Sequence, residues 1–455
     1  MSGKEQRIQK CIVTFARSWT ALSATRCLGR NGVQVITGDS SIATAASLSR
    51  YSIERFVYPE PDENPEGFID KIVKVAQKHS NPETDLVLMP THTCTRQVIL
   101  NRKRFEGIAK LAVPDIEQFE IADNKSLLSR FCQENNIWTP LTLAVDAPEE
   151  FRNKARTFKY PAFLKEATSL ASIGLHKVEN ADEAIRCFDE LVNRQEIHVR
   201  NQYPIMQEFV QGDDYCATFL FEHGEPRASM TYHNILSFPR NCGIGALRET
   251  VEAREMESIG IELLRKLRWN GVAEIDFRWD GHSTPFLIEV NPRFWAGMAQ
   301  SVESGWEYSY WLYKLAVDGT VKSYAPTAKK VKTWNPALTV LIAGQEFFEH
   351  KDSRKDLADA CGKFKEEYRR DEFGFLGILF EKISTLLNPH ERMEAVKRII
   401  DLERGAINEF ISDDDPLPVL GLMYPLIAFL QHGKMSTELL VGKTKLEKET
   451  NRRWR

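Results

Sequence analysis

Residues 271–297 contain two short apolar runs in which polar residues recur at regular intervals. Val272–Trp279 and Pro285–Val290 have the composition of β-strands, and a short polar turn joins them around the His282–Ser283 bond. If the hairpin is symmetric about that bond, residues whose numbers sum to 565 face each other. The pattern therefore predicts an antiparallel hairpin with a defined register.

Three polar residues share one face of this predicted hairpin. Asp276 and Glu289 are opposite each other, and Asn291 returns to the same face two residues later. Pro292 cannot donate to a β-ladder, so the strand should end there and release Arg293 next to the three polar groups. Two carboxylates and an amide oxygen suit a hard cation such as Mg²⁺. The alternative is a solvated hairpin face, but unpaired charges in so apolar a run would be costly. We expect a metal site.

The first 115 residues alternate between predicted strands and helices. Strands are expected at 10–15, 33–39, 85–89 and 111–113, and helices at 19–30 and 66–79. This alternation predicts a parallel α/β layer. The first strand–helix turn, residues 14–18, contains no glycine, so a dinucleotide site of the Rossmann type is not expected there.

Two lysines in the next part of the chain are candidates for binding phosphate. Lys165 ends an apolar strand, where an ammonium group is costly unless an anion pairs with it. Lys125 opens a predicted helix at 125–135, and taken alone it could equally be solvated. A further apolar strand is predicted at 204–210, followed by a turn at Gly212.

The overall composition limits the classes of protein and partner. A chain of 455 residues is long enough for two or three domains. The net charge of −4 does not suggest a nucleic-acid partner. The eight cysteines are scattered without a C-x-x-C pair, which favours a reducing compartment over a zinc site or a disulfide scaffold. No secretory signal and no transmembrane segment are recognised, so we expect a cytoplasmic protein.

The hairpin sequence IEVNPRFWAG resembles the metal-binding strand of the ATP-grasp superfamily, in which an acid, any residue and Asn are often followed by Arg. Asp276 matches the family's other metal carboxylate, and Lys125 and Lys165 resemble its two phosphate-side lysines. These matches occur in the family's order over residues 10–325. The resemblance implies an α/β fold class, with α+β ATP-grasp lobes, in three parts. We expect a pre-ATP-grasp α/β domain at 1–115, a two-lobed ATP-grasp core at 116–325, and a mostly α-helical region at 326–455.

The resemblance also implies a nucleotide site. Gln207, Glu208, Phe209 and Val210 match the interlobe hinge that contacts adenine, and Asp214 matches the acid that accepts from the ribose hydroxyls.

The segment 168–174 matches the loop that folds over the phosphates. It departs from the family because Gly174 is its one glycine; Ser172 supplies a hydroxyl donor. Two residues between strands, His233 and Arg240, are candidates for substrate contacts.

The activity implied is that of an ATP-dependent carboxylate–amine ligase. ATP would phosphorylate a small carboxylate to an acyl phosphate, and an amine would then displace the phosphate. Two Mg²⁺ ions, with Mn²⁺ as an alternative, would serve this transfer, and Arg293 and Lys165 are the expected catalytic residues. Two alternatives stay open: a catalytically weak nucleotide-binding regulatory protein, and a carboxylase or carbamoyl-phosphate type of enzyme. The sequence identifies neither substrate, and a homodimer is one candidate assembly.

Overall fold

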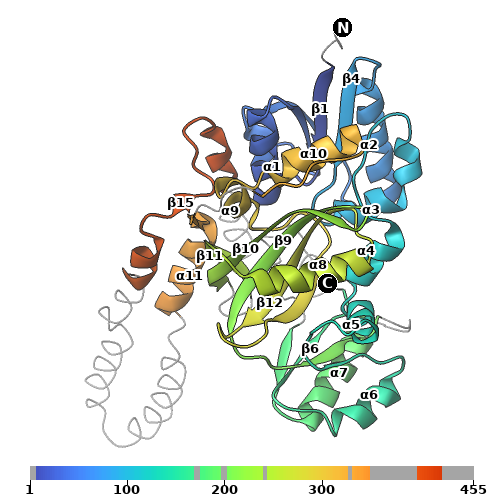
Figure 1. Cartoon of the computed structure of the whole chain (residues 1–455), viewed down its shortest axis with the longest axis vertical. Helices are drawn as coiled ribbons and strands as arrows, with labels where there is room; N and C mark the ends of the chain where they lie inside the picture. Colours follow the sequence, from blue (N-terminus) through green and yellow to red (C-terminus); the bar gives the residue numbers. More distant parts are fainter. Residues whose placement is uncertain are drawn as a thin grey trace, which may run out of the picture.

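A computed structural model describes residues 7–168, 175–195, 202–238, 243–325, 330–348 and 397–422. Figure 1 shows an N-terminal α/β layer at the top, a large sheet in the middle, and a smaller lobe with its own sheet below. Among the described residues, no helix is long and apolar enough to cross a membrane. The predicted α/β class is confirmed, because a parallel N-terminal layer adjoins two mixed α/β lobes.

The N-terminal layer is an all-parallel sheet. Its strands, in spatial order, are β3 (Ser52–Val57), β2 (Gln34–Asp39), β1 (Ile8–Val13) and β4 (Thr84–Met89). The strand β3 was not predicted. The strand expected at 111–113 is absent: Lys110 forms an isolated bridge with Val87. The chain then turns toward the large sheet, where the carbonyl of Ala112 lies against Gly271.

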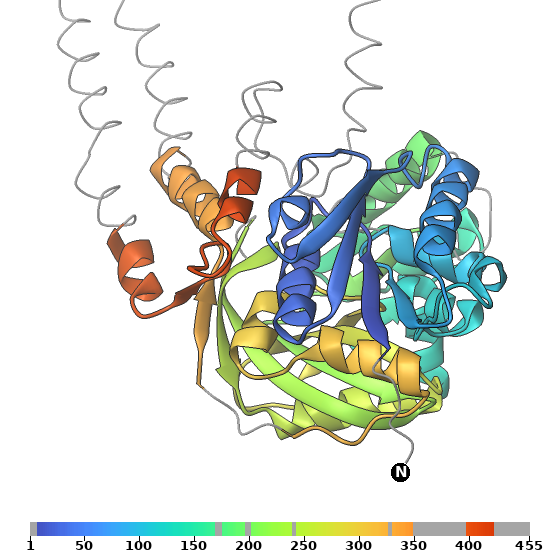
Figure 2. The same ribbon diagram turned by 90° about the horizontal axis from the view of Figure 1, so that it is seen from above.

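Helices cover both faces of this layer because its central strand alternates apolar side chains. Cys11 and Val13 face a core shared with α1 (Trp19–Arg30) and α10 (Tyr308–Asp318), whereas Ile12 faces the core built on α2 (Pro65–His79). The helices of this region are α1 (Trp19–Arg30), α2 (Pro65–His79), α3 (Cys94–Leu100), α4 (Ile116–Asp123), η1 (Ala46–Leu48) and η2 (Arg102–Phe105). Figure 2 shows the blue N-terminal layer lying over the yellow-green large sheet.

The large sheet carries the hairpin around which the site is built. Its strands, in spatial order, are β13 (Phe286–Asn291), β12 (Gly271–Trp279), β9 (Asp213–Glu222), β10 (Glu225–Phe238), β11 (Ile244–Val251), β14 (Lys332–Trp334) and β15 (Ile407–Asn408). Ala217, Phe219 and Phe221 of β9 pack on one face against α8 (Arg254–Lys266) and α5 (Lys125–Glu134). Cys216 and Leu220 point to the opposite face, toward the N-terminal layer. The helices α9 (Met298–Glu303) and α10 (Tyr308–Asp318) follow the hairpin.

The small lobe is a separate antiparallel sheet backed by two helices. Its strands lie in the order β5 (Thr142–Leu143), β8 (Ile205–Glu208), β6 (Ala162–Lys165) and β7 (His176–Val178). Phe151 of α6 (Pro148–Ala155) stacks on Phe188 of α7 (Ala181–Gln195) inside the lobe's own core. The lobe therefore has an independent core, and its strand ends face the large sheet.

The described part of the C-terminal region is built into the molecule. α11 (Pro336–Phe348) and residues 397–403 are helical, as expected, but β14 and β15 extend the large sheet (Figure 2) and η3 (Leu417–Leu422) packs on η1. The buried carboxylate of Asp415 accepts from Arg26 Nε at 2.9 Å. Strands of two or three residues, such as β15 and β14, have too little periodicity to be predicted. The three-domain division itself stays a prediction.

Candidate functional site

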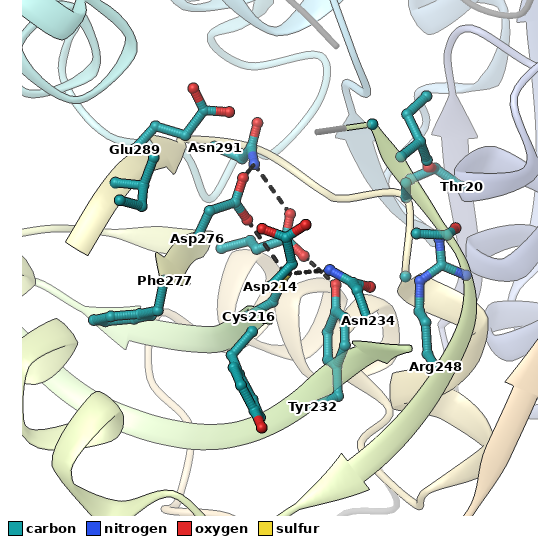
Figure 3. A pocket seen from close by; sticks show the side chains of 18 of the residues that line it. Thr20, Asp214, Cys216, Tyr232, Asn234, Arg248, Asp276, Phe277, Glu289 and Asn291 are labelled. Carbon is teal, nitrogen blue, oxygen red and sulfur yellow. Dashed lines mark hydrogen bonds between the residues drawn. The ribbon is translucent and has the colours of Figure 1, made fainter. Parts of the chain in front are cut away.

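A cavity of about 270 Å³ lies where the N-terminal layer, the large sheet and the small lobe meet. The start of α1 and the loop after β4 form one side, and β6 and β8 of the small lobe form another. The floor is the face of β9–β13 opposite α8, and Figure 3 shows side chains from these strands pointing into one space.

The predicted hairpin register is confirmed next to the cavity. Asp276 faces Glu289, and Asn291 faces Glu274, so both pairs sum to 565. A bulge between Asp276 and Phe277 shifts the register by one residue toward the turn. Pairing by a sum of 565 thus holds at the end of the hairpin that carries Asp276 and Glu289, and it fails nearer the turn.

The acids on this face form a connected polar cluster. Asn291 Nδ2 donates to Glu274 Oε2 at 3.1 Å and to Asp276 Oδ2 at 3.4 Å. The Cys216 thiol donates to Asp276 Oδ1 at 3.3 Å, and the Tyr232 hydroxyl donates to Glu274. The three residues Cys216, Glu274 and Asp276 bring ligand atoms within 4.8 Å of one another.

Two carboxylates of the cluster have raised pKa values. Burial raises the pKa of Asp276 well above its ordinary value, and the carboxylates of Glu274 and Glu289 raise it further. Burial likewise raises the pKa of Glu274, although its hydrogen bond from Tyr232 opposes the shift. A bound cation would reverse this electrostatic penalty, because it favours the ionised carboxylates.

Two lysines approach the cluster from the small-lobe side. Asn124 caps α5 by accepting from the backbone N–H groups of Ser126 and Leu127, which places Lys125 at the first helical position. Lys125 Nζ lies 3.2 Å from Glu289 Oε2. Burial would raise the pKa of Glu289, but Lys125 and Lys165 outweigh burial and the net shift is downward.

Lys165 ends β6 and is held by the neighbouring strand. Its Nζ donates to Gln207 Oε1 at 2.7 Å, and Gln207 in turn donates to Thr142. Burial lowers the pKa of Lys165 from 10.5 to about 8, against the opposing charge of Glu289. An anion entering the cavity would therefore meet an ammonium that lacks a close carboxylate among the described residues.

Asp214 lies at the entrance beside the hinge strand. Its carboxylate pairs with Arg278 Nε at 2.9 Å. Burial raises the pKa of Asp214 to about 6 despite that pairing.

The structure brings most of the predicted residues to this cavity. Those lining it are Lys125, Lys165, Gln207, Glu208, Val210, Asp214, Asp276, Glu289, Asn291 and Arg293. Arg293 Nη2 donates to Asn291 Oδ1 at 3.1 Å, so Arg293 lies next to Asn291. Ser172, Gly174 and Arg240 lie outside the described residues.

Two predicted residues do not line the cavity. Phe209 is 40% exposed and packs near Phe163. His233 stacks on Tyr215, with ring centroids 4.5 Å apart, and burial lowers its pKa. On a strand, neighbouring side chains point to opposite faces, so Tyr232 and Asn234 reach the cavity in place of His233.

Several cavity residues were missed by sequence reasoning. The same register rule that paired Asp276 with Glu289 would have paired Glu274 with Asn291, so this signal was present. The others come from separate strands or loops and left no local pattern; they are Cys216, Tyr232, Asn234 and Arg248 of the large sheet, Phe15, Arg17, Trp19, Thr20 and His92 of the N-terminal layer, and Phe410.

The donor set fits the predicted ion. Asp276 and Glu289 offer carboxylate oxygens on one face, which is what Mg²⁺ prefers, whereas Asn291 turns its amide nitrogen to Asp276 and its oxygen to Arg293. Burial and the carboxylates of Glu274 and Glu289 raise the pKa of Asp276, and a cation bound here would favour its ionised form. The nearby thiol of Cys216 stays protonated, because burial raises its pKa well above the ordinary value.

Comparison with known proteins places part of the chain in a family. Residues 122–297 match the family model of the ATP-grasp domain. The D-alanine–D-alanine ligase of Bordetella avium is 24% identical over 184 residues, which are 38% of this chain and 56% of that protein. The chain thus spans about half the length of this curated relative.

Solved structures share the fold at low sequence identity. The L-amino acid ligase from Bacillus licheniformis superposes with a TM-score of 0.54 at 14% identity, covering 72% of this chain and 80% of that one. The biotin carboxylase domain of the Hydrogenobacter thermophilus 2-oxoglutarate carboxylase gives 0.56 at 14% identity, covering 72% and 74%. At such identities the likeness concerns the fold. The part of the chain that matches the ATP-grasp domain model, residues 122–297, contains both lysines and the hairpin.

Proposed function

We propose that the protein is an ATP-dependent carboxylate–amine ligase whose reaction takes place in the cavity. The observation that carries this proposal is the convergence of two lysines, three acids and Arg293 on one space between the lobes. ATP would transfer its γ-phosphoryl group to a substrate carboxylate, and an amine would then attack the acyl phosphate and release phosphate. Such transfers depend on positioning and charge neutralisation.

The two lysines are proposed to hold the phosphates. Lys165 projects from the end of β6, and its present partner is the neutral amide of Gln207. Lys125 reaches the same space from the start of α5, 3.2 Å from Glu289. The backbone and side chains at Gln207, Glu208 and Val210 would receive the adenine, and Asp214 the ribose hydroxyls. Phe209 points away from the cavity and is left out of this proposal.

Asp276, Glu289 and Asn291 are proposed to hold Mg²⁺, which supplies charge neutralisation at the phosphates. Glu274 lies beside them and is fixed by bonds from Tyr232 and Asn291. The hydrogen bond from the Asn291 amide to Glu274 would orient Asn291, which is one of the proposed metal ligands.

Arg293 is proposed to contact the transferring phosphoryl group or the acyl phosphate. Its guanidinium is anchored on one side by Asn291 Oδ1 at 3.1 Å and by the Phe294 carbonyl at 3.0 Å. Its donors are therefore held in a fixed orientation next to the proposed metal residues. A preorganised guanidinium stabilises developing negative charge without moving during the reaction.

The test is ADP release from Mg-ATP in the presence of mixed small carboxylates and amines. We expect release that requires both a carboxylate and an amine, and formation of an amide product. Release that needs a carboxylate alone, or bicarbonate alone, would favour another ATP-grasp reaction. A protein that binds no Mg-ATP would contradict the proposal.

Three finer points are proposals from the sequence alone. Two Mg²⁺ ions, replaceable by Mn²⁺, would bind together with ATP. The chain would act in the cytoplasm, and a homodimer is the candidate assembly.

A further inference from the structure

Arg248 of β11 is a buried cation at the end of the cavity away from the lysines. Its side chain is 1% exposed, yet it borders the cavity. The strand β11 lies inside the large sheet, and Arg248 is paired there with Asn234 on one side and Thr333 on the other. A fully desolvated arginine is costly to place, so its location calls for an explanation.

Glu409, from the C-terminal segment, fixes this guanidinium. Its Oε1 accepts from Arg248 Nη1 at 2.6 Å and from Thr333 Oγ1 at 2.8 Å. Arg248 Nη2 donates to the carbonyl of Gly245. The carboxylate of Glu409 is itself 1% exposed and lies more than a hundred residues beyond the family match, which ends at 297. The pair is therefore rigid and is assembled from distant parts of the chain.

Two glycines keep the guanidinium open toward the cavity. A Cβ on Gly297 would stand 3.2 Å from Arg248 Nε and 2.5 Å from the Tyr232 hydroxyl, and a Cβ on Gly245 would stand 3.1 Å from Nε. Both glycines line the cavity. The Nε edge of Arg248 thus borders space that any larger residue would fill.

The same end of the cavity offers a hydrogen-bond acceptor that lacks a partner among the described residues. Asn234 Nδ2 donates to Cys216 Sγ at 3.3 Å, whereas its buried Oδ1 accepts no hydrogen bond. Figure 3 shows Asn234 and Arg248 side by side, with Thr20 of α1 nearby. This end therefore presents donors for an anion and one acceptor for an N–H group.

We propose that Arg248 binds the carboxylate of an amine substrate that also carries a carboxylate, and that Asn234 Oδ1 accepts from its amine. Glu409 is a positioning residue that holds the Arg248 guanidinium for this contact. The proposal rests on the proposed ligase function, because it names the second substrate of that reaction. Tyr232 and Glu274 lie between Arg248 and the proposed metal residues. Arg248 would therefore contact a group of the amine substrate that does not take part in the reaction. The amine would then be an amino acid and not a simple alkylamine.

The experiment compares two mixtures as ligands, using the shift in melting temperature. One mixture holds L- and D-amino acids, and the other holds the primary amines that lack the corresponding carboxylates. Each is titrated with and without Mg-ADP, whose own dissociation constant is measured by calorimetry. The wild type should be stabilised by the amino acids at concentrations about tenfold below those of the amines, since a hydrogen bond to a charged group is worth about this factor.

Three variants separate binding from structure. Arg248→Met should raise the amino-acid concentration needed by about tenfold or more. Glu409→Gln should reduce the preference for amino acids over amines while Mg-ADP affinity stays within about twofold. Arg227→Met is the matched control, because Arg227 pairs with Glu222 on a partly exposed turn away from the cavity. If Arg248→Met does not fold, the double variant Arg248→Met/Glu409→Gln removes both buried charges together.

The outcomes distinguish this proposal from the one it rests on. Equal stabilisation by the two mixtures, an unchanged response of a folded Arg248→Met variant, or a wild type that binds Mg-ADP but no amino acid would each overturn it. A wild type that binds no Mg-ADP would overturn the ligase proposal instead. The amino-acid titration without nucleotide would then still decide the role of Arg248.

Discussion

The two ends of the cavity are built in different ways. At the nucleotide end, Lys125, Lys165 and Glu289 belong to elements inside the range that matches the ATP-grasp model. At the opposite end, Arg248 pairs with Glu409, whose backbone carbonyl accepts from Arg26 of α1. The first end is formed by α5, by β6 of the small lobe and by β13 of the large sheet, which all lie within residues 122–297, whereas the second also needs Arg26 and Glu409 from outside that range.

This difference separates a part of the site that lies inside the family match from a part that also needs residues outside it. In the proposed function, the nucleotide end needs a fixed set of charges around phosphates and a metal, and the hairpin, β6 and the start of α5 would supply them. The α1 end is completed by a C-terminal segment outside the family match, through buried polar contacts. We therefore expect substitutions at the first end to change turnover, and substitutions at the second to change substrate choice or stability.

The largest effect is expected at Glu289. Glu289→Gln keeps the size of the side chain but removes the charge opposite Asp276 and the partner of Lys125. ADP formation should fall by about a thousandfold or more, since metal neutralisation is worth several kcal/mol. The melting temperature should change little, and Glu225→Gln, on an exposed turn, should behave as wild type in both assays. Near wild-type turnover of a folded Glu289→Gln protein would remove the metal assignment.

The second-largest effect is expected at Asp415, and it tests whether the C-terminal segment contributes to the stability of the fold. Asp415 is buried and accepts from Arg26 Nε, Ser49 Oγ and the Arg50 backbone N–H. Asp415→Ala leaves the Arg26 guanidinium without its carboxylate, and the free energy of unfolding should fall by about 3 kcal/mol. Urea denaturation measures this loss, with the exposed neighbour substitution Asp413→Ala as control. If the two variants were equally stable, the C-terminal segment would not be integral to the fold.

Local periodicity explains which parts of the site could be predicted. The alternation in β12 and β13 fixed Asp276, Glu289 and Asn291 on one face, because side chains on a strand repeat every two residues. The boundaries of α1 were predicted to the residue, since its apolar face and Ser18 cap are local signals.

The remaining parts depend on contacts that leave no local pattern. Glu409 lies after a two-residue strand, and its partner Arg248 is 161 residues away. The face of His233 could not be chosen before the register of β10 was known, and a shift of one residue exchanges it with its neighbours. Sequence reasoning therefore captured the nucleotide end far better than the α1 end.

A third prediction separates two roles for Arg293. If Arg293 acts on the transferring phosphoryl group, Arg293→Lys should lower kcat by about a hundredfold, because lysine cannot reproduce the paired N–H donors. The KM for ATP should stay nearly constant. If Arg293 instead holds the ground-state carboxylate, the KM for that substrate should rise at nearly constant kcat. Steady-state kinetics on this variant decides between them, and unchanged constants would place Arg293 outside the reaction.

The smallest effect is expected at Lys165, where binding and pH dependence can be tested together. Lys165→Met keeps most of the side-chain stem and should weaken Mg-ATP binding by about tenfold, since one charged hydrogen bond is lost. Lys154→Met, on the exposed side of the same lobe, is the matched control. Calorimetry at pH 7 measures both dissociation constants.

The sign of the pH effect follows from burial of the ammonium. The pKa of Lys165 in the folded protein is about 8, below its ordinary 10.5, because burial disfavours the charged form. Between these values the unfolded chain binds more protons than the folded one, so the free energy of unfolding of the wild type should rise with pH. Lys165→Met should lack that increase and should be at least as stable as the wild type at pH 7.

Nucleotide binding requires the charged form, so the affinity of the wild type for Mg-ATP should fall as the pH rises through 8, whereas that of the variant should not. Denaturation at pH 7.5 and pH 10 checks the predicted rise in the free energy of unfolding. A wild type and variant with parallel pH profiles would show that Lys165 titrates as an ordinary solvated lysine, and the phosphate contact would then have to be made by Lys125 alone.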